Sequence, residues 1–257
     1  MIEINIDPFA FRLGSFALLW SSIIEIVALT LALIIFVIEA RRFNLKKIHL
    51  LWLCLGFAIA GRLAARLVFL LEKLYFFNTI APVVGFYARM PGVVLGTTAV
   101  LLIYSKLTKF PLMPLMDLGA PSLYLFLTVF RVGCIINGCC FGLPCELPWA
   151  VMYNNPDSVA PLGIPSHPTQ AYHLIWAALV FSVVYILLKK PHIPGFPAFI
   201  GLFLYSAGDF SIRMLRADEP VAFGFSFTQA ILLLLAIFAA IMIIYLKFTR
   251  QRSESAT

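Results

Sequence analysis

The stretch SFALLWSSIIEIVALTLALIIFVI, residues 15–38, holds one charged residue in 24 positions and decides the class of this protein. A helix of about 20 apolar residues is long enough to cross the roughly 30 Å hydrocarbon core of a bilayer. Similar runs follow along the chain: 62% of its 257 residues are hydrophobic and 12% are charged, against about 25% charged in soluble domains. These proportions exclude a water-soluble globule and predict an all-α, polytopic membrane protein.

Turn residues between the apolar runs divide the chain into seven predicted transmembrane helices. Their expected ranges are 15–38, 50–74, 91–105, 119–138, 168–188, 195–215 and 226–247. We treat residues 1–257 as a single membrane domain, because the apolar runs take up most of the sequence. The segment before the first run is acidic and differs from the basic start of a cleavable signal peptide, so we expect it to be retained.

The basic residues divide unevenly between the two sets of loops. Eleven follow the first, third, fifth and seventh predicted helices: Arg41, Arg42, Lys46, Lys47, Lys106, Lys109, Lys189, Lys190, Lys247, Arg250 and Arg252. Three are on the other side: Arg12, Arg89 and Arg216. The positive-inside rule therefore predicts a cytoplasmic C-terminus and an outside N-terminus. Residues 139–167 then form an outward-facing loop or small cap. Because the net charge of +7 is spread along the chain, we expect contact with anionic lipid heads and no nucleic-acid partner.

Ionisable residues inside the predicted spans need a reason to be there, because each costs roughly 2.5–3.5 kcal/mol on insertion scales. Arg131 lies toward the outer end of the fourth helix. Its guanidinium could bind a phosphate or carboxylate through two hydrogen bonds, or it could pair within the protein or snorkel to lipid heads. Arg62 and Arg66 lie one turn apart and should repel, so we expect Glu25 to pair with them, with a bound phosphate as the alternative.

The sixth predicted helix carries a stripe of three charged residues. Asp209, Arg213 and Arg216 fall at positions i, i+4 and i+7. The spacing favours an ion pair between Asp209 and Arg213 over a proton relay. We expect Arg216 to lie at the membrane interface.

Four of the five cysteines form one motif, Cys134-x4-Cys139-Cys140-x4-Cys145. They could form disulfides, with three pairings open to four cysteines, or be small buried residues. A cysteine near a guanidinium could also be a reactive thiol. We expect no metal site, because the motif lacks a C-x2-C unit and His167 is the only imidazole nearby.

His167 immediately precedes Pro168 at the predicted start of the fifth helix. The helix dipole favours the neutral imidazole there, which could accept a proton from a thiol. A helix-capping or merely exposed histidine is the alternative. Tyr172 and His173 follow, and either could be an interface anchor.

These residues make the chain similar to the prolipoprotein diacylglyceryl transferase family of the bacterial inner membrane, along nearly its whole length. The family signature G-R-x-G-N-F-x-N-x-E-x-x-G aligns with residues 130–142, where four fixed positions match: Arg131, Gly133, Asn137 and Gly142. The other four are replaced by Phe130, Cys134, Ile135 and Cys139. HPTQAYH at residues 167–173 resembles the family motif H-P-[ST]-Q-L-Y-E, and PGVVLG has Pro91 where the family has a histidine.

The resemblance implies transfer of a diacylglyceryl group from phosphatidylglycerol to the lipobox cysteine thiol of a prolipoprotein, with release of glycerol phosphate. Arg131 would hold the leaving phosphate. Since the usual histidine is missing, we assign His167 as the base. The expected substrate-binding residues are Arg62, Asn137, Gly142, Gln170, Tyr172 and Arg216.

We therefore expect a multi-pass enzyme of the bacterial plasma membrane, monomeric and without a cofactor. Its partners would be phosphatidylglycerol, the prolipoprotein signal peptide and the bilayer. Two other interpretations stay open. The chain could be a non-catalytic relative that binds phospholipid or lipoprotein, or a membrane redox protein that uses Cys139 and Cys140.

Overall fold

The computed structural model describes residues 1–14, 16–41, 47–76, 90–218 and 225–255, and this part of the chain contains seven helices and four short strands. The helices are α1 (Trp20–Ala40), α2 (Lys47–Phe76), α3 (Met90–Thr108), α4 (Leu112–Asn137), α5 (Thr169–Lys189), α6 (Phe196–Arg213) and α7 (Phe227–Ser255). The strands are β1 (Ile2–Ile4), β2 (Phe9–Leu13), β3 (Phe16–Leu19) and β4 (Val151–Tyr153). The loop residues Arg42, Lys46 and Arg89 and the side chains of Lys47 and Pro91 lie outside the described residues.

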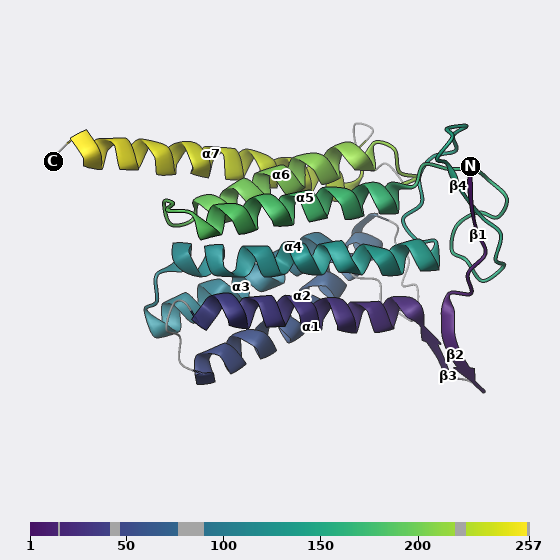
Figure 1. The fold of residues 1–257 in the computed structure, drawn as a ribbon, viewed down its shortest axis with the longest axis horizontal. Helices are drawn as coiled ribbons and strands as arrows, with labels where there is room; N and C mark the ends of the chain where they lie inside the picture. Colours follow the sequence, from purple (N-terminus) through teal and green to yellow (C-terminus); the bar gives the residue numbers. More distant parts are fainter. Residues whose placement is uncertain (15, 42–46, 77–89, 219–224, 256–257) are drawn as a thin grey trace.

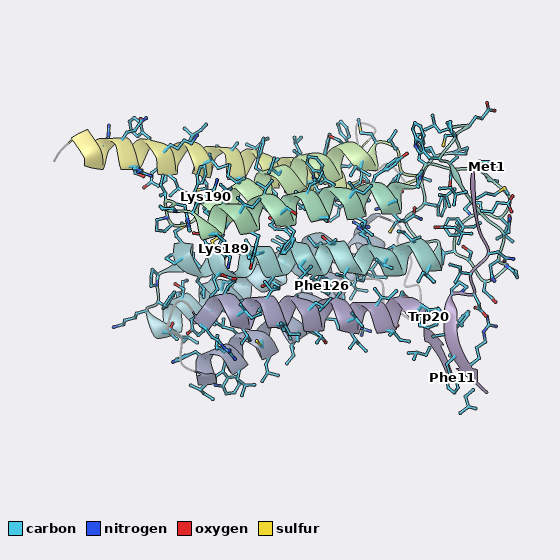
Figure 2. All side chains as sticks on the ribbon, in the orientation of Figure 1. Met1, Phe11, Trp20, Phe126, Lys189 and Lys190 are labelled. Atoms are coloured by element: carbon cyan, nitrogen blue, oxygen red, sulfur yellow. The ribbon has the colours of Figure 1, made fainter. Side chains whose placement is uncertain are left out.

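Five helices, α1, α2, α4, α5 and α7, are long and apolar enough to cross a membrane. The apolar part of α3, Gly92–Thr108, is shorter, and α6, which carries Asp209 and Arg213, is not among the five. Large apolar side chains cover the outside of the bundle (Figure 2): Leu63, Leu234 and Ile244 are 62%, 67% and 69% exposed. A soluble protein rarely exposes apolar surface on this scale, whereas lipid tails solvate it. The structure is that of a membrane protein.

The helices run along the long axis of the molecule, with the strands and the loop after α4 gathered at one end (Figure 1). The closest helix pairs are α1 with α4, α2 with α3, α4 with α5, and α6 with α7. Since α4 packs against both α1 and α5, its residues Leu115, Leu118 and Leu127 are fully buried. Side chains near the strand end of α4 are therefore enclosed by several helices.

The predicted all-α architecture is confirmed, with short strands added to it, mainly at the N-terminus. Residues 16–19, predicted to begin the first helix, form β3, which pairs antiparallel with β2, and α1 begins only at Trp20. β1 pairs in parallel with β4, so that Ile2 faces Val151 across the ladder. Hydropathy did not separate these strands from helices because short apolar runs suit either structure.

Two buried carboxylates fix the opposite end of the bundle. Asp117 on α4 accepts hydrogen bonds from the backbone N–H groups of Gly195 and Ala198, at 2.6 and 3.0 Å, and so satisfies the open start of α6. Glu39 on α1 pairs with Lys189 on α5 at 2.6 Å. These contacts fix α4 against α6 and α1 against α5, and so help to position the polar residues farther along these helices.

Candidate active site

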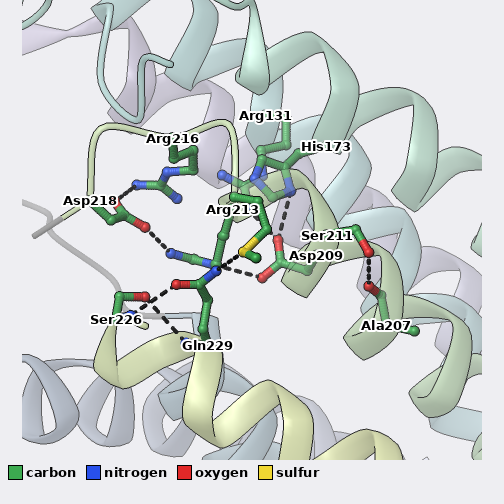
Figure 3. A network of polar contacts seen from close by, with 11 residues as sticks. Arg131, His173, Ala207, Asp209, Ser211, Arg213, Arg216, Asp218, Ser226 and Gln229 are labelled. Atoms are coloured by element: carbon green, nitrogen blue, oxygen red, sulfur yellow. Dashed lines mark hydrogen bonds and ion pairs between the residues drawn. The ribbon is translucent and has the colours of Figure 1, made fainter. Parts of the chain in front are cut away.

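A group of charged side chains, which we call the polar cluster, lies toward the strand end of the bundle (Figure 3). Its members come from three helices and the segment after α6: Arg131, His173, Asp209, Arg213, Arg216 and Asp218. Five of them are at most 7% exposed at the side chain, and Asp218 is 18% exposed. Buried charges persist in proteins only when other charges or ligands compensate them, so their partners reveal what the cluster can bind.

Asp209 is the centre of the polar cluster. Its Oδ2 accepts a hydrogen bond from Arg213 Nε at 3.0 Å, which confirms the ion pair predicted from their spacing. Its Oδ1 lies 2.6 Å from His173 Nδ1 and 3.6 Å from Arg131 Nη2. One carboxylate thus joins α4, α5 and α6, and its contact with Arg131 is longer than a hydrogen bond.

Arg216 is buried inside the protein just after α6. Its side chain is 7% exposed, and its Nη2 lies 2.8 Å from Asp218 Oδ1. The other Asp218 oxygen accepts a hydrogen bond from Arg213 Nη1, also at 2.8 Å. Asp218, just beyond the predicted helix, thus supplies a compensating charge for both arginines.

The polar cluster carries an excess of positive charge. Counted over the described residues and with neutral His173, its three guanidiniums face two carboxylates, which leaves one positive charge over. Arg131 Nη2 and Arg216 Nε are buried and have no hydrogen-bond partner among those residues. Leaving such donors unpaired costs about 1–3 kcal/mol each, more for charged groups. The arrangement suits an anion that accepts hydrogen bonds from both arginines, such as a phosphate.

Gly142 lies between His167 and Arg216. Its N–H donates to the His167 carbonyl at 3.1 Å, and it forms a bridge to Arg216 on its other side. A Cβ atom at Gly142 would meet His167 Cβ and its carbonyl oxygen at 2.5 Å and the Leu215 carbonyl oxygen at 2.8 Å. Only glycine therefore permits this approach, which brings His167 next to the segment that carries Arg216. The Nδ1 atom of His167 is buried and has no hydrogen-bond partner among the residues that the structure describes.

Gln170 and Tyr172 make internal contacts beside the same loop. Gln170 is buried, and its Nε2 donates to the Cys139 carbonyl at 2.9 Å and contacts the Tyr153 hydroxyl at 3.4 Å. The Tyr172 hydroxyl accepts a hydrogen bond from Trp149 Nε1 at 2.8 Å. Asn137 is the last residue of α4, and its carbonyl accepts the Val159 N–H at 3.1 Å. These residues therefore tie the loop after α4 to the start of α5.

The cysteines of the motif divide into a group of three and a separate residue. The sulfur atoms of Cys134, Cys139 and Cys140 lie within 4.8 Å of one another, and Cys145 is not part of this group. All five cysteines of the chain are free thiols in this structure. Hydrogen bonding from neighbouring thiols and the positive charges of Arg216 and Arg131 hold the pKa of Cys140 well below its ordinary value.

A cavity of about 370 Å³ opens between α1, α2, α3 and α4, with residues of α6 and α7 closing it. Its lining is almost entirely apolar. Arg62 and Glu25 line it as well, and Arg62 Nη1 lies 3.0 Å from Glu25 Oε1, which confirms the predicted partner of Arg62. Arg62 is thus separate from the polar cluster.

Two tyrosines connect the cavity with the polar cluster. Tyr124 lines the cavity, and its ring centroid lies 5.7 Å from that of Tyr205. Tyr205 in turn is a neighbour of Arg131. Two buried tyrosines therefore stand between the cavity and Arg131.

Sequence reasoning missed the roles of His173, Asp218 and Tyr205 in this site. His173 gave one signal, because it stands where the family motif has an acidic residue and an imidazole can contact the Asp209 carboxylate. Nothing local marked Asp218 or Tyr205. Their importance comes from contacts between different helices and loops.

Comparisons with known proteins agree with this geometry. The sequence model of the family described as prolipoprotein diacylglyceryl transferase matches residues 8–245. A phosphatidylglycerol–prolipoprotein diacylglyceryl transferase of Dehalococcoides mccartyi is 31% identical over 258 residues, covering 99% of this chain and 97% of that protein. Proteins of the same name from Polynucleobacter asymbioticus and Listeria monocytogenes are 31% and 25% identical, over 87% and 93% of this chain and 87% and 90% of theirs.

Proposed function

The chain belongs to the prolipoprotein diacylglyceryl transferase family, and from that premise we propose that it transfers a diacylglyceryl group from phosphatidylglycerol to the cysteine thiol of a prolipoprotein. The observation that carries the proposal is the polar cluster, which has one excess positive charge and two buried guanidinium N–H groups without partners. The apolar cavity beside it supplies room for acyl chains.

We propose that the protein is a single multi-pass domain of the bacterial plasma membrane, with seven spans, an outside N-terminus and a cytoplasmic C-terminus, acting as a monomer. The basic residues Lys189 and Lys190 lie at the end of the bundle away from Met1 and the strands (Figure 2). This separation of charge supports the orientation, because cytoplasmic loops are rich in lysine and arginine. Residues 139–167 then form an outward-facing loop or cap over the polar cluster, on the side where prolipoproteins would present their cysteine.

The phosphate of phosphatidylglycerol is assigned to Arg131 and Arg216. A phosphate oxygen can accept hydrogen bonds from Arg131 Nη2 and Arg216 Nε, the two arginine donors of the cluster that have no partner in the described part of the chain. Charge-assisted hydrogen bonds of this kind are about twice as strong as neutral ones. Binding one negative phosphate would also balance the excess positive charge of the cluster.

The remaining predicted residues serve the lipid and the loop. The acyl chains lie in the cavity, where Arg62 and Glu25 neutralise each other. Gly142 and Gln170 hold the loop against α5, while Asn137 and Tyr172 face the glycerol head group and the incoming peptide.

The reaction replaces a carbon–oxygen bond with a carbon–sulfur bond. His167 Nδ1 accepts the proton of the substrate thiol, and the sulfur bonds to the carbon of the diacylglyceryl group that carries the phosphate. The electron pair of the breaking carbon–oxygen bond stays on the phosphate oxygen, so glycerol phosphate leaves. Arg131 and Arg216 stabilise the negative charge that develops there, a role in which one well-placed donor contributes about 2.7–4 kcal/mol.

The test is a transfer assay with the purified protein in lipid, phosphatidylglycerol labelled in its acyl chains and a peptide that contains a lipobox cysteine. Mass spectrometry should find a thioether-linked diacylglyceryl group on the peptide and one glycerol phosphate released for each transfer. Binding of the lipid without any product would instead identify a non-catalytic relative. A matched peptide with serine in place of the cysteine should give no product.

A further inference from the structure

Three thiols converge at the end of α4. Cys134 lies in the last turn of the helix, and Cys139 and Cys140 follow directly after its C-cap, Gly138. Their sulfur atoms lie within 4.8 Å of one another, and we call these three residues the thiol cluster. Cys134 is buried and the other two are half-buried. No other group of three or more histidine, cysteine or acidic side chains with this spacing occurs among the described residues.

The backbone after α4 is shaped to bring these sulfurs together. Gly138 has φ of 71° and Cys140 has φ of 62°. A left-handed conformation costs a residue with a side chain roughly 1–2 kcal/mol. Strain of this kind persists where the surroundings impose it and is concentrated at functional sites. The left-handed conformation of Cys140 is therefore a sign that the surrounding structure imposes the position of this residue.

Two side chains from the start of α5 hold the turn in this conformation. Thr169 Oγ1 donates a hydrogen bond to the Cys140 carbonyl at 2.6 Å, and Gln170 Nε2 donates to the Cys139 carbonyl at 2.9 Å. Both side chains are buried. The thiol cluster is thus supported by surrounding hydrogen bonds, as is usual for residues that bind metal ions.

Positive charge lies close to the thiol cluster. Arg131 and Arg216 both act on Cys140 through their positive charge. Three thiolates around a divalent ion carry a net charge of −1, and around a monovalent ion a net charge of −2. Nearby positive charge lowers the cost of burying such an anionic complex.

We propose that the thiol cluster binds one thiophilic d10 metal ion, Zn2+ or Cu+, through the three sulfur atoms of Cys134, Cys139 and Cys140. Thiolate ligands select these soft ions. Zinc–sulfur bonds are about 2.3 Å long. Three sulfurs bound to one ion therefore lie closer to one another than 4.8 Å, the distance within which they lie here. Rotation of the cysteine side chains can bring them closer. The proposal differs from the sequence expectation of no metal site. The contact of Cys134 with the turn that carries Cys139 and Cys140 brings the thiols together without a C-x2-C unit.

The experiment measures metal binding by the full-length protein in detergent, reduced under anaerobic conditions until all five thiols are titratable. Zn2+ and Cu+ are added in separate arms, each against a chelator of known affinity. We expect one ion per chain in at least one arm. The absorption edge and fine structure of that ion should report three sulfur neighbours, at about 2.3 Å for zinc. The arm with the higher affinity identifies the ion.

Variants assign the ligands. Cys134→Ser, Cys139→Ser and Cys140→Ser should each weaken binding at least tenfold, and the triple variant should bind no metal. Cys54→Ser and Cys145→Ser are the matched controls, since both replace a half-buried cysteine outside the cluster, and neither should change affinity.

Several results would overturn the proposal. These are binding of neither ion in stoichiometric amount, fewer than three sulfur neighbours in the loaded protein, or undiminished binding by the triple variant. Rapid formation of a disulfide within the cluster that the metal does not prevent would also overturn it. Should the triple variant not fold, the sulfur count of the unmodified protein decides alone. Because these readouts are independent of diacylglyceryl transfer, the site can fail while the proposed activity stands.

Discussion

The guanidinium of Arg131 on α4 stands 3.6 Å from the carboxylate of Asp209 on α6, farther than a hydrogen bond. Asp209 is already engaged by Arg213 at 3.0 Å and by His173 at 2.6 Å. Asp209 therefore balances Arg131 only in part. One nitrogen of Arg131 remains available to a ligand, and Asp209 would keep its other partners if Arg131 were removed.

Replacing Arg131 should therefore abolish function without unfolding the protein. In Arg131→Ala the phosphate loses its main cation, and we expect transfer to fall at least about a hundredfold, the usual effect of removing one charge-stabilising donor. The measurement is the rate of labelled diacylglyceryl transfer, together with the yield and thermal stability of the purified protein. Arg131→Lys should recover only part of the rate, because an ammonium cannot form two parallel hydrogen bonds. Full activity of Arg131→Ala would contradict the assignment.

Replacing Asp209 should lower the stability of the protein, in contrast with replacing Arg131. Asp209→Asn leaves Arg213, Arg131 and Arg216 with only the Asp218 carboxylate. Breaking a buried pair in this way costs about 3–5 kcal/mol of stability. We expect a clearly lower unfolding temperature in detergent. The control is Asp7→Asn, since the Asp7 side chain is 52% exposed and an exposed pair contributes at most about 1 kcal/mol. Equal stability of the two variants would show that Asp209 does not hold the helices together.

Gly142→Ala tests the close approach of the loop after α4 to His167 and Leu215. Its Cβ would lie 2.5 Å from His167 atoms and 2.8 Å from the Leu215 carbonyl oxygen. Overpacking of this kind costs about 1–3 kcal/mol, and the displacement of His167 should lower transfer as well. Gly119→Ala, which lines the cavity, is a control for stability alone, because its Cβ would make one ordinary contact at 3.7 Å. Unchanged stability and rate in Gly142→Ala would disprove the need for glycine.

His167→Ala tests the proposed base. General bases contribute about a hundredfold to ten-thousandfold to a rate, so we expect a loss in that range with the affinity for phosphatidylglycerol unchanged. Imidazole added to the assay should restore part of the rate, because it can enter the space that the side chain leaves. His49→Ala, at the start of α2, should behave like the unmodified protein. A rate loss that imidazole does not relieve would indicate a structural role.

The cavity can be tested by filling it. Ala58 on α2 lines the cavity, and Ala58→Phe should raise KM for phosphatidylglycerol several-fold while leaving kcat largely unchanged. The adjacent Ile59 is 58% exposed on the outside of the bundle, so Ile59→Phe adds an aromatic ring without entering the cavity. If both variants bind the lipid equally well, the acyl chains do not lie there.

Local patterns in the sequence predicted much of the fold and some of the contacts. Apolar runs indicated seven helices, and five of these are long and apolar enough to span a membrane. The pairs Asp209–Arg213 and Glu25–Arg62 were also predicted. The first depends only on helical spacing. The second follows because a buried charge needs a counter-charge and few were available. The family was recognisable from the motifs around Arg131 and His167.

The site itself was decided by the tertiary structure. Asp209 joins three helices, Gly142 brings His167 beside Arg216, and the turn after Gly138 carries two cysteines to Cys134. The first two contacts connect residues far apart in the sequence, and their geometry depends on how α4, α5 and α6 pack. Hydropathy and spacing report only which face of one helix is apolar or charged. They do not fix the rotation of one helix against another, and that rotation determines which buried polar atoms meet.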